Sequence, residues 1–128
     1  MSNLEKELSL AKPDDWHLHL RDGAEMASVV GFSAQRFARA IVMPNLRPPV
    51  TDTARALAYR DRILAALPKG HGFTPLMTLY LTDELPPEEI AVAKKSGSVS
   101  AVKLYPAGAT TNAESGVISL KRIYPEIG

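Results

Sequence analysis

The chain has 128 residues, no cysteine and a formal net charge of +1, and 45% of its residues are hydrophobic. This length and composition are typical of one globular domain, and a chain without cysteine has neither disulfides nor thiolate metal sites. The weak charge favours neither nucleic acid nor a membrane surface as a partner. No apolar stretch reaches the roughly 20 residues of a membrane span, and no secretory signal is recognisable, so we expect a cytoplasmic protein.

Four strands are predicted to alternate with three helices. Short apolar runs bounded by Pro, Gly, Asp or Asn predict strands at residues 16–21, 40–43, 74–81 and 99–105. Helical patterns cover residues 24–32, 53–67 and 88–96. Asp52 or Thr53 can cap the second helix, and Leu57, Leu64 and Leu67 recur on one side of it. Strands that alternate with helices indicate an α/β protein with a parallel sheet and right-handed crossovers.

The first predicted strand contains the stretch DWHLHLRDG, with two of the three histidines of the chain. Side chains alternate along a strand, so Trp16, Leu18 and Leu20 are expected to pack under helices. His17, His19 and Arg21 then share the opposite face. Two imidazoles at i and i+2 can bind one metal ion, and a neighbouring arginine can bind an anion beside it. Two half-buried histidines bonded to backbone are the alternative.

Asn45 and Lys103 are the other polar residues at predicted strand ends. Asn45 ends the second strand in MPN, where it is either a turn residue or a hydrogen-bonding group for a polar substrate. Lys103 lies within the apolar run VSAVKLY. It either extends its amine to solvent or, when desolvated, loses its proton and reacts with carbon dioxide to give a carbamate that can bridge two metal ions. The third histidine, His71, falls in a turn and is expected at the surface.

Three motifs in this order, HLHLRDG, AIVMPNLRPPV and AVKLYPAGATTN, resemble the N-terminal part of a dihydroorotase of the bacterial stand-alone type. Dihydroorotases belong to the amidohydrolase superfamily, and the resemblance extends over essentially the whole chain. It implies that His17 and His19 are zinc ligands and that Lys103 is the carboxylated lysine that bridges two zinc ions. Arg21 and Asn45 are implied to bind the substrate carboxylate. Thr110 and Thr111 are implied to belong to a mobile loop over the substrate.

The resemblance also implies the reaction, which is the reversible hydrolysis of dihydroorotate to N-carbamoyl-aspartate in pyrimidine (UMP) biosynthesis. Two zinc ions would lower the pKa of a bridging water and polarise the ring amide. The implied partner is this small-molecule substrate, with no nucleic acid and no membrane, and the full-length protein is implied to be a homodimer.

The implied fold is a (β/α)8 TIM-type barrel, which typically needs about 250 residues. Residues 1–128 are therefore expected to be the N-terminal portion of a single amidohydrolase barrel domain, incomplete in this chain. The remaining zinc-binding histidines and the catalytic aspartate of the family would lie beyond Gly128, so the isolated chain is expected to be inactive.

Three alternatives remain open. The chain could be a non-catalytic half barrel that binds a partner subunit, such as a dihydroorotase or an aspartate transcarbamoylase. It could also belong to another cyclic amidohydrolase, such as a hydantoinase or allantoinase, although the combination of MPN with LYPAGATTN disfavours this. A phosphoesterase with a His-x-His strand would account for the first motif but gives no reason for Lys103.

Overall fold

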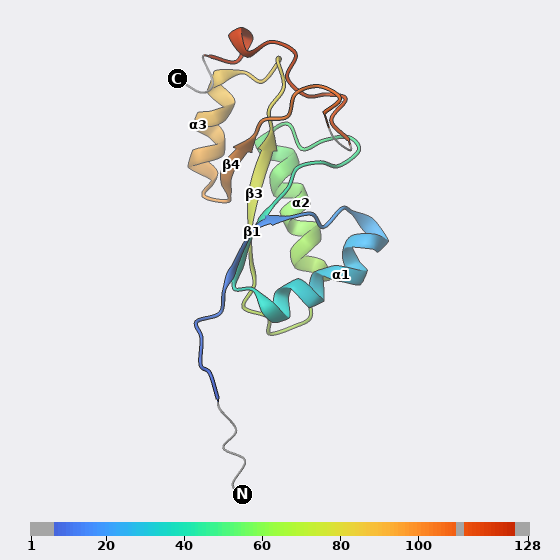
Figure 1. Ribbon diagram of the computed structural model, residues 1–128, viewed down its shortest axis with the longest axis vertical. Coiled ribbons are helices and arrows are strands. Elements are labelled where there is room, and N and C mark those ends of the chain that lie inside the picture. Colours follow the sequence, from blue (N-terminus) through green and yellow to red (C-terminus); the bar gives the residue numbers. More distant parts are fainter. Residues whose placement is uncertain (1–6, 110–111, 125–128) are drawn as a thin grey trace, which may run out of the picture.

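The computed structural model describes residues 7–109 and 112–124. Four strands alternate with three helices along these residues, as Figure 1 shows. In chain order the elements are β1 (Asp14–Leu18), α1 (Gly23–Arg36), β2 (Arg39–Val42), α2 (Thr53–Ala66), β3 (Thr74–Tyr80), α3 (Pro87–Ser96), β4 (Val99–Lys103) and a 3-10 turn, η1 (Leu120–Arg122).

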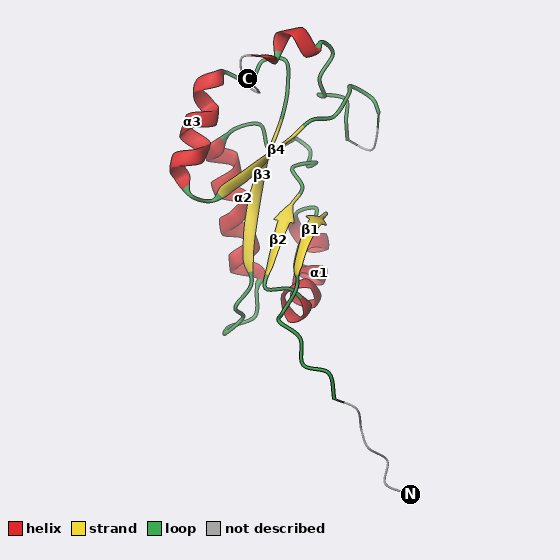
Figure 2. Cartoon of the chain, turned by 60° about the vertical axis from the view of Figure 1, so that its left-hand side comes forward, coloured by secondary structure: helices red, strands yellow, loops and turns green. Residues whose placement is uncertain are grey.

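The strands form one sheet in the order β1-β2-β3-β4, and every neighbouring pair is parallel. Each strand therefore lies beside the next one in the chain, with a helix as the crossover between them. Right-handed crossovers in this sequential order place all the helices on one face of the sheet, which agrees with the layers in Figure 2. The predicted α/β class with parallel βα units is confirmed, and this arrangement is that of a segment of a (β/α)8 barrel.

The hydrophobic core lies between the sheet and the helices. Its fully buried members come from every layer, including Val30 of α1, Val42 of β2, Ile63 of α2 and Leu79 of β3. Of the three leucines that recur on one side of α2, Leu57 and Leu64 are 36% and 37% exposed, and Leu67 packs against the core. The helix is rotated so that its core side carries smaller and aromatic residues together with an isoleucine, namely Thr53, Ala56, Tyr59 and Ile63.

The helix ends follow the sequence closely. The Asp52 side chain accepts a hydrogen bond from the Arg55 backbone N–H, so Asp52 caps α2 and Thr53 is its first residue. Asp22 caps α1 by accepting from the backbone N–H of Gly23. Gly97 ends α3 at φ 69°, a left-handed conformation that glycine adopts without steric cost. α1 continues to Arg36, four residues beyond the predicted end.

The first strand differs most from its prediction, because it starts at Asp14 and ends at Leu18. Asp15 pairs with Ala40 and Leu18 with Val42, so three steps on β1 oppose two steps on β2. This bulge interrupts the regular alternation. Trp16 is 69% exposed rather than packed under a helix, whereas Leu18 contacts the core and Leu20 is fully buried. The fourth strand likewise ends at Lys103, two residues early.

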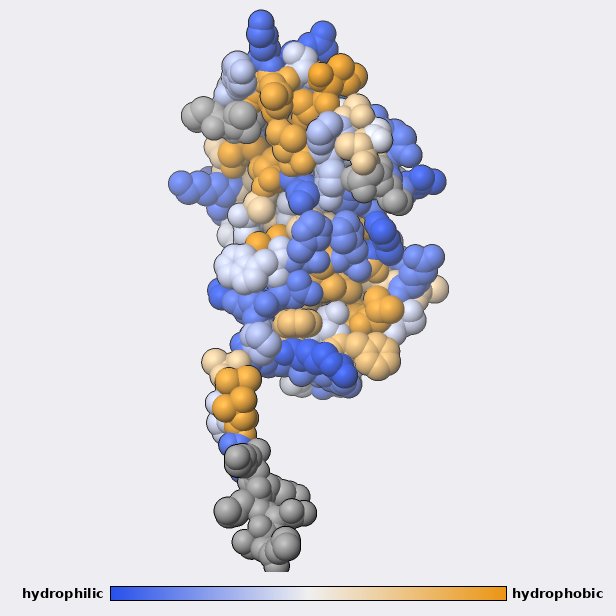
Figure 3. All heavy atoms as spheres, in the orientation of Figure 1, coloured by the Kyte–Doolittle hydropathy of each residue, from blue (hydrophilic) through white to orange (hydrophobic). Residues whose placement is uncertain are grey.

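Apolar side chains remain at the surface near the end of the chain. Figure 3 shows an extensive apolar area in the upper part of the molecule, where β4 and the segment after it lie in Figure 1. The exposed large apolar residues of these segments are Val102, Leu104, Ile118 and Leu120. None of the helices in the described part of the chain is both long and apolar enough to cross a membrane.

Candidate functional site

A cavity of about 360 Å³ lies where β1, β2 and β4 end. Its walls are formed by His17, His19, Arg21, Asn45, Lys103, Tyr105 and Ala109. Five of the site residues expected from the sequence therefore meet in one place. Thr110 and Thr111 lie outside the described residues. His71 lies in the loop between α2 and β3, at the opposite end of the sheet.

The two histidines of β1 and its extension converge on one point. The Nε2 atoms of His17 and His19 lie 3.1 Å apart, and the ring centroids are 5.1 Å apart. Partial burial, together with the positive charges of Arg21, His17 and Lys103, holds the pKa of His19 below its ordinary value. The neutral imidazole, which is the form that binds metal, is therefore favoured at His19.

Arg21 connects the segment after β1 to the loop after β2. Its Nη1 donates a hydrogen bond to the backbone carbonyl of Asn45 at 3.4 Å. Arg21 has φ 59°, a left-handed backbone conformation that is uncommon for residues other than Gly, Asn and Asp. Such strain persists only where neighbouring groups hold it. Here the hydroxyl of Tyr59 donates a hydrogen bond to the Arg21 carbonyl oxygen.

Asn45 is 2% exposed, yet both polar atoms of its side-chain amide lack a hydrogen-bond partner among the described residues. A buried amide without partners costs on the order of 1–3 kcal/mol, so such groups in native structures have a reason. Asn45 is one of the residues that line the cavity, as is Arg21. An amide in this position can offer both a donor and an acceptor to a polar ligand.

Lys103 completes the wall on the side of β4. It is half-buried, and its Nζ lies 5.1 Å from the centre of the Tyr105 ring. Tyr105 in turn stacks on Tyr80 with ring centroids 5.5 Å apart. The Lys103 amine thus lies over an aromatic pair, and both Lys103 and Tyr105 line the cavity.

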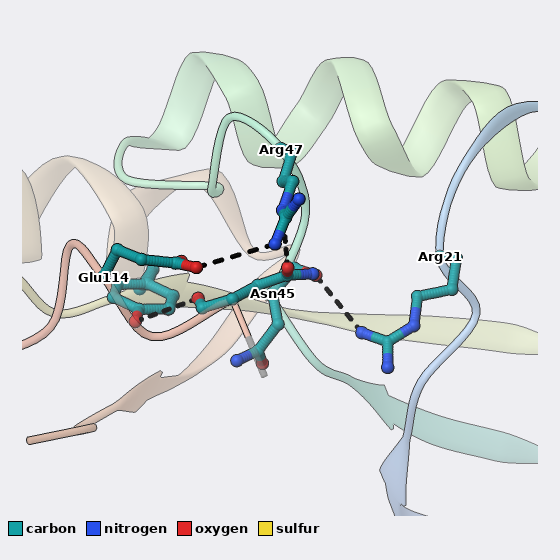
Figure 4. A network of polar contacts seen from close by, with 6 residues as sticks. Arg21, Asn45, Arg47 and Glu114 are labelled. Carbon is teal, nitrogen blue, oxygen red and sulfur yellow. Dashed lines mark hydrogen bonds and ion pairs between the residues drawn. The ribbon is translucent and has the colours of Figure 1, made fainter. Parts of the chain in front are cut away.

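A polar network joins the loop after β4 to the loop after β2, as Figure 4 shows. The Asn112 amide donates to the Asn45 carbonyl at 3.3 Å, and its oxygen accepts from Nε of Arg47 at 2.6 Å. Arg47 also pairs with Glu114 at 3.5 Å, and the Tyr80 hydroxyl donates to the Asn112 carbonyl at 3.3 Å. These bonds tie Asn112 and Glu114 to the loop after β2 and to Tyr80.

Several of these residues were not predicted. Arg47 and Asn112 are far apart in the sequence, and their hydrogen bond spans 65 residues. Nothing in the local pattern of Tyr59 distinguishes it from an ordinary core tyrosine. Asn112 adopts φ 58°, and the small-residue run PAGATTN before it was the one signal that this loop takes an irregular path.

A larger hollow of about 650 Å³ lies between the loops after β2 and β3 and the segment near Gly116. Its carboxylates already act as structural acceptors. Asp83 accepts from the backbone N–H groups of Ile118 and Ser119, and Glu89 accepts from that of Thr53. No set of three or more His, Asp or Glu side chains gathers as a metal site among residues 7–109 and 112–124. The smaller cavity is therefore the candidate site.

The structural class of the protein is defined by its parallel βα sheet with a polar cavity at the carboxyl ends of the strands. The chain is an α/β structure of the barrel-forming kind, in which ligand sites collect at that end. Its cavity combines a histidine pair, a lysine and an arginine. No family model matches the chain.

The particular resemblance is to dihydroorotases. The chain is 64% identical over 122 residues to a dihydroorotase of Cupriavidus taiwanensis, covering 95% of the chain and 36% of that relative. It is 62% identical over 120 residues to a dihydroorotase of Azoarcus sp., covering 94% of the chain and 35% of the relative. The resemblance inferred from the three motifs is confirmed, and the chain spans about a third of the length of these relatives.

Solved structures agree with this resemblance. The fold matches a crystal structure of dihydroorotase from Campylobacter jejuni with a TM-score of 0.80 and 40% identity, covering 89% of this chain and 33% of that one. It also matches dihydroorotase from Saccharomyces cerevisiae in complex with 5-fluoroorotic acid, with a TM-score of 0.79 and 35% identity, covering 88% of this chain and 31% of that one.

Proposed function

We propose that this chain supplies the first metal ligands and the carboxylate-binding residues of a dihydroorotase, which reversibly hydrolyses dihydroorotate to N-carbamoyl-aspartate. The observation that carries the proposal is the cavity at the strand ends, where His17, His19, Lys103, Arg21 and Asn45 meet. Hydantoinase and allantoinase activities find no support among the named relatives, which are dihydroorotases.

The histidine pair fits a zinc ion. Two nitrogens that bind a tetrahedral zinc at about 2.0–2.1 Å lie about 3.3 Å apart. The Nε2 atoms of His17 and His19 are 3.1 Å apart without any rearrangement. His17, His19 and a carboxylated Lys103 would hold zinc here, with Lys103 between two ions. Bound zinc supplies an activated water and polarises the amide carbonyl.

The remaining groups of the cavity suit the substrate. Arg21 offers a planar guanidinium, which pairs well with a carboxylate, and Asn45 offers an amide N–H beside it. Substrate binding would give the buried Asn45 amide the partner that it lacks among the described residues. Thr110 and Thr111 are proposed, from the resemblance alone, to belong to the loop over the substrate.

The broader context of the enzyme follows from the same resemblance. We propose that residues 1–128 form the N-terminal portion of one amidohydrolase barrel domain, and that the enzyme acts in cytoplasmic pyrimidine biosynthesis as a homodimer. Its partner would be the small-molecule substrate, with no nucleic acid and no membrane.

A chimera tests the function. This chain would replace the matching third of the Cupriavidus taiwanensis dihydroorotase, to which it is 64% identical. We expect zinc-dependent turnover of dihydroorotate by the chimera, loss of turnover with H17A or H19A, and retained turnover with the matched control H71A. We expect none from the isolated chain. A folded chimera that binds zinc but does not turn over dihydroorotate would contradict the proposal and favour a non-catalytic half barrel.

A further inference from the structure

Two residues of α2 contact the chain at Arg21 and Asp22, Tyr59 through the Arg21 backbone carbonyl and Arg62 through the Asp22 side chain. Tyr59 is 1% exposed, and its hydroxyl donates to the Arg21 carbonyl. One turn further along the same helix face, Arg62 forms a two-pronged ion pair with Asp22, with Nε to Oδ1 at 3.0 Å and Nη2 to Oδ2 at 2.8 Å. The Arg62 guanidinium also lies over the Tyr59 ring, 5.4 Å from its centre.

These contacts lie where the backbone has positive φ angles. Arg21 has φ 59°, and Gly23 two residues later has φ 57°, so the backbone turns sharply between the end of β1 and the start of α1. A left-handed conformation is unfavourable for an arginine and persists only where its surroundings hold it. The Tyr59 hydroxyl fixes the Arg21 carbonyl, while Arg62 and the Gly23 N–H fix both oxygens of Asp22.

We propose that Tyr59 and Arg62 are positioning residues, which hold the Arg21 backbone in its left-handed conformation so that the guanidinium faces the cavity beside Asn45. Neither residue is a wall of that cavity, so each acts through Arg21. The proposal deepens the proposed function and rests on its assignment of Arg21 to the substrate carboxylate. A guanidinium on a backbone free to relax would lose its preorganised geometry and bind a carboxylate less tightly.

The test uses the protein as expressed from its own gene and measures its affinity for dihydroorotate by calorimetry. The variants are Y59F, R62Q, R21Q and the double variant R21Q/Y59F, and R60Q is the matched control on the same helix. Dihydrouracil, which has the same ring but no carboxylate, is the comparison ligand. We expect Y59F and R62Q each to weaken dihydroorotate binding by about five- to tenfold, and R60Q to leave it unchanged.

Two further results distinguish a specific positioning of Arg21 from an unspecific loss of rigidity in the binding site. Y59F should leave the affinity for dihydrouracil unchanged, and it should add nothing in the R21Q background, because the two residues act as one unit. Equal weakening toward both ligands, or additive effects in the double variant, would overturn the positioning role. Unchanged dihydroorotate binding in R21Q would instead overturn the assignment of Arg21 in the proposed function, and the positioning proposal with it.

Discussion

The Nε2 atoms of His17 and His19 point at a common position and lie 3.1 Å apart. We therefore predict that both histidines bind one zinc ion. Replacement of either by alanine should weaken zinc binding by more than about tenfold, because the ion loses one of its direct ligands. Competition with a chromogenic chelator measures the affinity. H71A serves as the control, since His71 lies at the other end of the sheet, and an equal loss in H71A would contradict the assignment.

Lys103 is predicted to carry a carbamate. It shares the cavity with His17, His19 and Arg21, so an anionic group on its nitrogen would face three groups that favour negative charge or metal. The zinc-loaded protein equilibrated with ¹³C-bicarbonate should give a carbamate carbon signal by NMR. The signal should vanish in K103Q and persist in K94Q, a matched change on α3. A signal that survives in K103Q would place the carbamate elsewhere.

Asn45 is predicted to favour ligand binding at the expense of stability. Replacing its unpaired buried amide with the similarly shaped leucine should raise the free energy of unfolding by about 1–2 kcal/mol, because the desolvation cost is removed. The same change should abolish measurable dihydroorotate binding. Urea denaturation and calorimetry measure the two effects.

Thr78 provides the control for that experiment. Its hydroxyl is also buried without a partner among the described residues, but it is not a wall of the cavity. T78V should therefore stabilise the protein and leave ligand binding intact. If N45L destabilised the protein while T78V stabilised it, the Asn45 amide would have a structural partner and the argument for a ligand would fail.

A lower pH should weaken the ion pair between Arg62 of α2 and Asp22, which caps the start of α1. The hydrogen bonds from Arg62 hold the pKa of Asp22 below its usual value. The pair then adds stability above the unfolded-state pKa of about 4 and loses it as the pH falls through the lower folded-state pKa. Because both side chains are partly exposed, with 46% exposure for Arg62 and 40% for Asp22, the contribution is at most about 1 kcal/mol.

D22N and R62Q should both flatten the acid side of the stability curve, as measured by urea denaturation at a series of pH values below 5. D22N should give the flatter slope, since it removes the titrating carboxylate itself, whereas R62Q leaves Asp22 with the hydrogen bond from the Gly23 N–H. A wild-type slope in R62Q would mean that the Gly23 N–H, and not Arg62, lowers the pKa of Asp22.

Local patterns were sufficient to predict the order of the elements and the grouping of the site residues. Strand signals at four places, with helix caps such as Asp52 and Gly97 between them, define a parallel sheet, and parallel strands bring their carboxyl ends to one edge. His17, Arg21, Asn45 and Lys103 all lie at or just after such ends, so their meeting in one cavity follows from the topology.

The rest depended on tertiary contacts that no local pattern encodes. The core side of α2 carries Tyr59 and Ile63, and the recurrence of leucines along the helix does not mark that side. The bond between Arg47 and Asn112 joins two loops whose relative position exists only in the folded chain. Trp16 is exposed, although its residue type and its place in the alternation both favour burial. It lies in the bulged part of the pairing between β1 and β2, which no local pattern predicts.

The bulge in β1 makes the two ends of that strand independent of each other. Asp14 is tied to Arg39 at one end, and Leu18 is paired with Val42 at the other, with one extra residue between them. Without that residue, a strand held by Asp14 would place His17 opposite Val42, facing the core. The extra residue therefore decides which way His17 faces, while Asp14 keeps its ion pair with Arg39. Transplanting this histidine pair into another parallel sheet accordingly requires the bulge together with the pairing of Leu18.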